Sequence, residues 1–167
     1  EAADVVQQFV SGVNCHPGTA REEMLAVKRQ FGKEDGTVAY HGYQSFAPGE
    51  VTPELAHEIG VKLAKQLWGE KYQVIVATHL DKSNHLHNHF VVNTVSFLDG
   101  IKYHRTGQDY RQMREASDAL CREYGLSVID QPEPGKSKQY GEWRAEQENR
   151  PTWRGMIRAE IDEAIRQ

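Results

Sequence analysis

Two apolar segments separated by a short polar stretch most constrain the fold of this chain. Residues 72–79 (YQVIVATH) and 85–97 (HLHNHFVVNTVSF) are rich in the β-branched and aromatic residues that favour strands. Only residues 80–84 separate them. A connection this short indicates a hairpin, and therefore a pair of antiparallel strands.

The rest of the chain predicts helices on either side of further strand sequence. Residues 38–46 (VAYHGYQSF) alternate as a strand does, and Thr52 followed by Pro53 is a typical helix start. We expect helices over residues 19–31, 52–68, 108–124 and 152–166. The predicted fold is α+β, an antiparallel β-sheet with helices packed on it. We expect a core over residues 1–130, and a linker with a C-terminal helical extension over residues 131–167.

Four of the eight histidines fall within the hairpin sequence. His85, His87 and His89 alternate along one strand and so point to one face, and His79 ends the neighbouring strand. Three imidazoles that converge from two strands can hold a divalent cation and leave positions open for a substrate. Strand geometry alone leaves open which three of the four histidines would bind it. A histidine-rich surface without metal, and a closed structural site with four ligands, are the alternatives.

The string HLDKSNHLHNHFVVN, residues 79–93, resembles the third motif of plasmid and conjugative-transposon relaxases. These are mobilisation nucleases of the MobA/VirD type, in the His-hydrophobe-His endonuclease superfamily. The segment AYHGYQSFAPGEVTPELAHEIG, residues 39–60, and the later strings SDALCREYGLSVI, YGEWRAE and TWRGMIRAEID are also similar to that group. The resemblance implies a relaxase-type nuclease core whose metal ligands are His79, His87 and His89. Asn88 stands where the family has a hydrophobic residue.

The resemblance also implies a mechanism, in which a tyrosine attacks a scissile phosphate at an origin of transfer and remains joined to the 5′ end. The family tyrosine lies near the N-terminus, so we expect it upstream of Glu1, with Tyr40 and Tyr43 as weaker candidates. Asp81 is expected to orient a ligand histidine or assist the nucleophile, and Glu50 is a weaker candidate for that role. The expected metal is Mn²⁺ or Mg²⁺ in function, with Zn²⁺ or Ni²⁺ possible in a purified sample.

The charge of the chain does not indicate general nucleic-acid binding, since the net charge is −4. Local basic residues lie in the second half. Expected contacts to single-stranded or hairpin origin DNA are Gln44, Ser45, Lys102, Arg105 and Arg111. The family further implies accessory relaxosome proteins, a coupling protein and the bacterial cytoplasm. No apolar run reaches the length of about 18 residues that a membrane helix requires.

Two other functions are compatible with the histidine pattern. A rolling-circle replication initiator or a transposase of the same superfamily would place its tyrosine on a helix after the histidines, where Tyr110, Tyr124 and Tyr140 are available. A non-catalytic module would use metal or DNA binding without cleavage.

Overall fold

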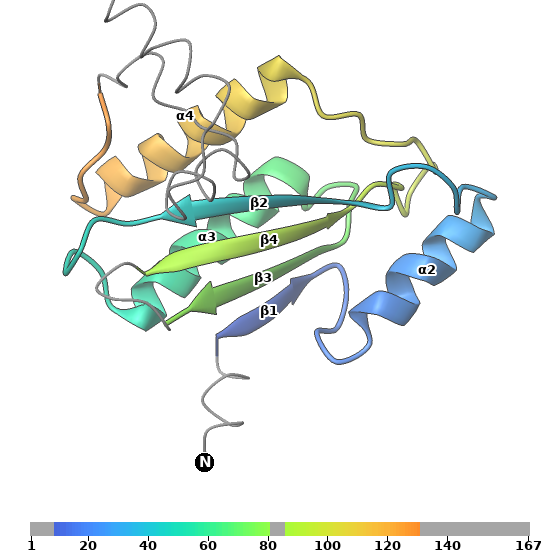
Figure 1. Ribbon diagram of the computed structural model, residues 1–167, viewed down its shortest axis with the longest axis horizontal. Helices are drawn as coiled ribbons and strands as arrows, with labels where there is room; N and C mark the ends of the chain where they lie inside the picture. The colour runs from blue at the N-terminus through green and yellow to red at the C-terminus, as the bar shows by residue number, and fades with distance from the viewer. Residues whose placement is uncertain (1–8, 81–85, 131–167) are drawn as a thin grey trace, which may run out of the picture. The chain divides into compact units, whose positions relative to one another are not determined.

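The computed structural model describes residues 9–80 and 86–130 of the 167-residue chain (Figure 1). Contacts divide the chain into two units, residues 1–129 and 130–167, and the described elements belong to the first. In chain order these elements are β1 (Val10–Val13), α2 (Ala20–Gln30), β2 (Ala39–Ser45), α3 (Pro53–Trp68), β3 (Val74–His79), β4 (His87–Asn93) and α4 (Gly107–Glu123). The α+β prediction is confirmed. The helix expected over residues 152–166 lies outside the described residues.

The strands form an antiparallel sheet in the order β1-β3-β4-β2 (Figure 1). β3 and β4 pair as the predicted hairpin, and His79 lies opposite His87. On its other side β4 pairs with β2, which places Tyr43 opposite His89. β1 was not anticipated from the sequence, since it has only four residues and one of them is a glycine.

Helices α3 and α4 pack on one face of this sheet. Val74 and Val76 of β3 and Phe90 of β4 are fully buried in one core with Ile59 and Leu63 of α3. Leu55, Ile59 and Leu63 recur every four residues and so form an apolar stripe along α3 that faces the sheet. Full burial of an aliphatic or aromatic side chain contributes roughly 1.5–3 kcal/mol. This apolar layer is the core that holds the strands in register.

The opposite face of the sheet is covered at one end by α2 and bears histidines at the other. Asn93 fastens α2 to β4, since its Nδ2 donates to the Met24 carbonyl and its Oδ1 accepts from the buried Lys28 Nζ. We call the uncovered part the histidine face, because alternation and register place on it His41, Tyr43, Ser45, His79, His87 and His89.

Both long helices begin at side-chain caps. The Thr52 hydroxyl accepts a hydrogen bond from the Leu55 amide at the start of α3, as predicted. Thr106 and Asp109 form a reciprocal capping box at the start of α4. Gly125 follows the end of α4 at a φ of +69°, the left-handed conformation that glycine adopts readily.

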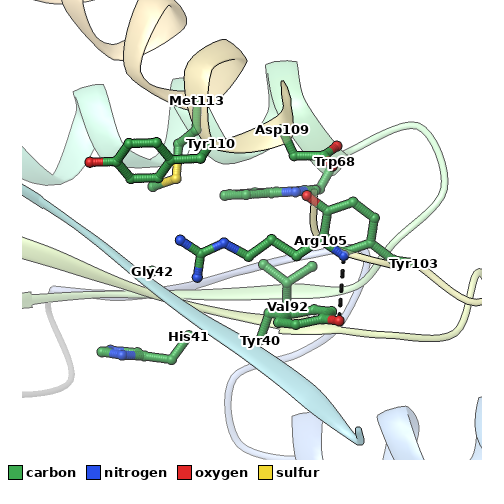
Figure 2. Close-up of a pocket in the computed structure, with 10 residues that line it drawn as sticks. All are labelled: Tyr40, His41, Gly42, Trp68, Val92, Tyr103, Arg105, Asp109, Tyr110 and Met113. Carbon is green, nitrogen blue, oxygen red and sulfur yellow. Dashed lines mark hydrogen bonds between the residues drawn. The ribbon is translucent and has the colours of Figure 1, made fainter. Parts of the chain in front are cut away.

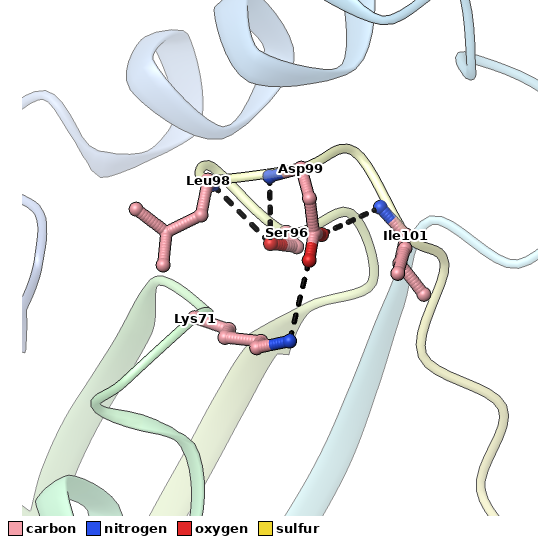
Figure 3. A network of polar contacts seen from close by, with 5 residues as sticks. All are labelled: Lys71, Ser96, Leu98, Asp99 and Ile101. Atoms are coloured by element: carbon pink, nitrogen blue, oxygen red, sulfur yellow. Dashed lines mark hydrogen bonds and ion pairs between the residues drawn. The ribbon is translucent and has the colours of Figure 1, made fainter.

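A polar turn leads from β4 toward α4 (Figure 3). The Ser96 Oγ accepts from the amides of Leu98 and Asp99, while the Asp99 carboxylate accepts from the Ile101 amide and pairs with Lys71 at 3.2 Å. These contacts fix the loop that returns the chain to the helix layer. Among the described residues, no helix has the length and apolar character needed to cross a membrane.

Candidate metal centre

Three histidines converge where β3 ends and β4 begins. His79, His87 and His89 each offer one ring nitrogen, and these three nitrogens lie within 4.8 Å of one another. The ring centroids are 5.2 Å apart for His79 and His87, 4.2 Å for His79 and His89, and 4.9 Å for His87 and His89. The structure thus assembles the group that the family motif designates. His85 lies outside the described residues.

The donor set fits one divalent cation. Two nitrogens on the same ion are at most about twice the metal–nitrogen bond of roughly 2.1 Å apart, so small side-chain rotations suffice to close a 4.8 Å spacing. Three imidazoles also leave coordination positions for substrate oxygens, as a catalytic site requires. His79 is exposed and the other two are half-buried, so the site is accessible from the histidine face.

A further histidine, His41 of β2, contacts this group. Its Nε2 lies 2.6 Å from Nδ1 of His89, and the two ring planes are inclined by only 21°. An imidazole N–H lies in its ring plane, so a short N···N contact between near-parallel rings means that they meet edge to edge. Sequence reasoning missed His41, because strand alternation does not reveal the register between β2 and β4.

On the helix side of the sheet, beneath the histidines, a chain of buried hydrogen bonds links β3, β4 and β2. The Thr78 hydroxyl donates to Oδ1 of Asn88, whose Nδ2 donates to Oε1 of Gln44 and to the Ala56 carbonyl. Asn88 is fully buried on the helix side, between the two ligand positions of β4. Its amide is therefore held at three points, which fixes the backbone from which His87 and His89 project.

His57 of α3 extends this chain to β1. Its Nδ1 lies 2.8 Å from the Thr78 hydroxyl and its Nε2 lies 2.7 Å from the Ser11 hydroxyl. Since the Thr78 proton goes to Asn88, Nδ1 of His57 must donate, and in the neutral ring Nε2 then accepts from the Ser11 hydroxyl. This tautomer is neutral, in agreement with burial, which lowers the pKa of His57.

Gly60 allows α3 to approach Asn88 closely enough for this contact. A Cβ atom at position 60 would lie 2.4 Å from Nδ2 and 2.7 Å from Cγ of Asn88, and 3.2 Å from Cγ1 of Val76. Real Cβ atoms essentially never show contacts as short as the two to Asn88. The glycine thus creates the space in which the Asn88 amide reaches the Ala56 carbonyl.

Two expected site residues face the helices instead of the histidines. Gln44 is 5% exposed, and its Nε2 donates to the Ser117 hydroxyl of α4, so it is not available to DNA and that prediction is wrong. Tyr40 lies on the same side of β2, opposite Val92, in a small cavity of about 30 Å³ that Tyr103 and Arg105 also line (Figure 2). The register therefore directs the Tyr40 hydroxyl away from the metal centre, which excludes it as the nucleophile.

The structure describes one of the two expected carboxylates, Glu50. The Glu50 carboxylate accepts hydrogen bonds from the amide and hydroxyl of Ser127, just after α4. These contacts tie that segment to the start of α3, and the role expected for Glu50 at the metal centre stays a prediction. Asp81 lies outside the described residues, and its role stays a prediction.

The remaining expected DNA contacts are dispersed. Ser45 is exposed on the histidine face, directly opposite His87. The Lys102 Nζ donates to the Asp35 carbonyl, and the Arg105 guanidinium lies 5.8 Å from the Tyr110 ring centroid. Arg111 is exposed on α4, the helix layer on the other side of the sheet. Only Ser45 of this group neighbours the triad in register.

Of the other candidate tyrosines, those that the structure describes lie either in the α4 layer or on the histidine face. Tyr110 and Tyr124 belong to the α4 layer, and the Tyr124 hydroxyl donates to the Glu58 carboxylate and contacts Lys62 of α3. Tyr140 lies outside the described residues. Tyr43, by contrast, is 67% exposed on the histidine face. Among the described residues the geometry thus does not favour a nucleophile on the helix that follows the histidines.

Comparison with known proteins gives one family. Residues 2–126 match the family described as "Relaxase: MobA/VirD2-like, nuclease domain". Two Staphylococcus aureus proteins named "Protein rlx" are 38% identical over 157 residues and 41% identical over 120 residues, which cover 92% and 72% of this chain. "Group II intron-interrupted relaxase LtrB" of Lactococcus lactis subsp. cremoris is 27% identical over 128 residues, or 68% of this chain.

The similarity covers a minority of each relative. The chain spans 47% and 38% of the two staphylococcal proteins and 23% of the lactococcal one. No solved structure matches the chain significantly.

Proposed function

Because the chain belongs to the MobA/VirD2-like relaxases through their nuclease domain, we propose that it is the nicking unit of a metal-dependent relaxase. It would cleave one DNA strand at an origin of transfer and so begin conjugative transfer. The observation that supports this most is the triad of His79, His87 and His89, whose donor atoms lie within 4.8 Å on an open sheet face. The lactococcal relative is named a relaxase, which agrees with this role.

Each side chain of the triad has a defined task in this proposal. His79, His87 and His89 would hold one divalent cation, which would supply Lewis-acid stabilisation of the scissile phosphate. Neutral imidazoles leave the full positive charge available to the phosphate. We propose Mn²⁺ or Mg²⁺ in function, and imidazole ligands favour Mn²⁺, Zn²⁺ and Ni²⁺ over Mg²⁺. Ser45, beside His87, would donate a hydrogen bond from its hydroxyl to a phosphate oxygen.

The nucleophile is proposed to be a tyrosine upstream of Glu1. Its phenolic oxygen forms a bond to phosphorus while the bond to the 3′ oxygen breaks. The phenolic proton leaves, the 3′ oxygen takes up a proton, and the 5′ phosphate remains on the tyrosine. Tyr43 is the alternative within the chain, because it is the exposed tyrosine on the histidine face in the described part of the structure. Asp81 would orient a ligand histidine or assist this proton transfer.

The proposed partners are single-stranded or hairpin origin DNA, together with accessory relaxosome proteins and a coupling protein. Arg105, Lys102 and Arg111 remain proposed DNA contacts outside the triad. Such contacts predict that binding weakens as salt rises.

Cleavage of a single-stranded origin oligonucleotide tests the proposal. We compare the 167-residue chain, the same chain extended by its native upstream residues, and the extended chain with His87→Ala, each with Mn²⁺ and with EDTA. The expected result is a covalent 5′-DNA adduct only in the extended chain with metal and an intact triad. An adduct on the 167-residue chain that Tyr43→Phe abolishes would assign the nucleophile to Tyr43. Metal-independent cleavage, or no cleavage by any form, would overturn the metal-dependent nickase.

A further inference from the structure

His41 lies beside the metal centre without belonging to it. In register it is opposite Val91, one diagonal step across the strands from His89. Diagonal neighbours on one face of an antiparallel pair are about 7–8 Å apart at their Cα atoms, within reach of two imidazole side chains. The edge-to-edge contact of 2.6 Å between His41 Nε2 and His89 Nδ1 is the result.

This contact determines which nitrogen of His89 can bind a cation. Nδ1 is occupied by His41, so the ligand atom of His89 is Nε2, a buried nitrogen. A nitrogen that binds a cation carries no proton, so the proton of the neutral His89 ring is on Nδ1 and is donated to His41. His41 then accepts at Nε2 and holds its own proton on Nδ1.

We propose that His41 is a positioning residue that fixes the tautomer and ring orientation of His89 and so raises the metal affinity of the triad. The inference rests on the metal site of the proposed function and adds a neutral outer partner to it. Metal-binding histidines generally donate their second ring N–H to such a partner, and loss of the partner typically weakens metal binding roughly 10–100-fold. His41 supplies an acceptor without the charge of a carboxylate, and therefore does not neutralise the cation.

His41 lies on the exposed side of β2, next to Tyr43. The ring of Tyr43 is centred 6.4 Å from that of His41, so the two side chains form an exposed aromatic pair beside His89. His41 and Tyr43 are both exposed, so replacements at position 41 disturb little of the core. Substitution can therefore separate the effect on metal binding from an effect on folding.

Metal titration of the chain with Co²⁺, by calorimetry and by visible absorption, tests the inference. His41→Phe keeps a ring but removes the acceptor, and we expect Co²⁺ affinity to fall roughly 10–100-fold. His41→Gln retains an acceptor oxygen at similar reach, and we expect it to restore most of that loss. The matched control is His16→Phe, which removes an exposed histidine between β1 and α2 and should leave Co²⁺ affinity unchanged. Melting temperatures of the metal-free forms check that folding is intact.

Three results would overturn the role of His41. The first is an unchanged Co²⁺ affinity in His41→Phe, and the second is a Co²⁺ affinity in His41→Gln as low as in His41→Phe. The third is a changed Co²⁺ spectrum in His41→Phe together with a loss of Co²⁺ affinity as large as that of His87→Ala. The last would make His41 a ligand itself. If the unaltered chain bound no Co²⁺, the metal site of the proposed function would fail as well. Failure of the inference alone is recognised by intact binding that depends on His87 but not on His41.

Discussion

Replacement of Gly60 by alanine has two opposing effects on the stability of the fold, and their magnitudes can be compared. In a helix interior, alanine is favoured over glycine by about 1 kcal/mol, so Gly60→Ala should stabilise α3 taken alone. In the folded chain the added Cβ would lie 2.4 Å from the Asn88 Nδ2 and 2.7 Å from its Cγ. Either the Asn88 amide must move or α3 must shift away from the sheet.

The Asn88 amide has little freedom to move. Its Oδ1 accepts from Thr78 and its Nδ2 donates to Gln44 and to the Ala56 carbonyl, all in a buried layer. Loss of a buried partner costs roughly 1–3 kcal/mol, and overpacking costs roughly 1–3 kcal/mol. With both costs present and the helix propensity gain of about 1 kcal/mol deducted, we expect Gly60→Ala to lower the free energy of unfolding by about 1–5 kcal/mol.

Urea unfolding followed by circular dichroism measures this loss, and Co²⁺ titration of the folded variant measures its effect on the triad. We expect weaker metal binding, because Asn88 lies between the ligand positions of β4. Gly107→Ala is the matched control: Gly107 begins α4, and nothing lies within 4 Å of a Cβ built there. That change should be neutral or slightly stabilising. If Gly60→Ala were as stable as Gly107→Ala, α3 would not be held against Asn88 as the contacts indicate.

Three further substitutions test the buried hydrogen bonds of His57 and the roles of Tyr40 and Glu50. Burial lowers the pKa of His57, so the unfolded chain takes up a proton there that the native chain resists. The free energy of unfolding should therefore fall as pH drops below about 6.5, and less so in His57→Gln, as urea unfolding at several pH values would show; equal losses would contradict the neutral ring. Tyr40→Phe should leave nicking by the N-terminally extended chain unchanged, since the Tyr40 hydroxyl faces the helix layer; an adduct lost in this variant would place that hydroxyl in the reaction. Glu50→Gln should leave Co²⁺ affinity unchanged because its carboxylate contacts Ser127, and a weakened titration would return it to the metal centre.

The histidine hairpin was predictable because two rules of local geometry suffice for it. A short connection imposes antiparallel pairing, and the period of two directs His87 and His89 to one face. The α3 stripe and its Thr52 cap follow equally local rules. The α+β class could therefore be predicted from the sequence.

The alternation of side chains along a strand also shows an error in the predicted DNA contacts. Gln44 and Ser45 are adjacent on β2, so they cannot both point toward the histidines, and the structure places Ser45 on the histidine face and Gln44 beneath it. The same rule separates Tyr40 from His41. The sequence contains this information, because residues 38–46 alternate as a strand does.

Other features depend on contacts between distant segments and were not accessible from the sequence. The His41–His89 hydrogen bond needs the register of β2 on β4, which α3 and β3 separate in the chain. The hydrogen-bonded layer from Ser11 to Asn88 needs β1, a strand too short for the pattern to reveal. Tertiary pairing determines both.

Anomalous diffraction from crystals grown with Mn²⁺ tests the metal centre most directly. We predict one anomalous peak per chain, bonded to His79, His87 and His89, with the His89 bond made through Nε2 and His41 still within hydrogen-bond distance of Nδ1. The same experiment on His87→Ala should show no peak at this position. A peak elsewhere, or a triad without an ion at saturating Mn²⁺, would contradict the account.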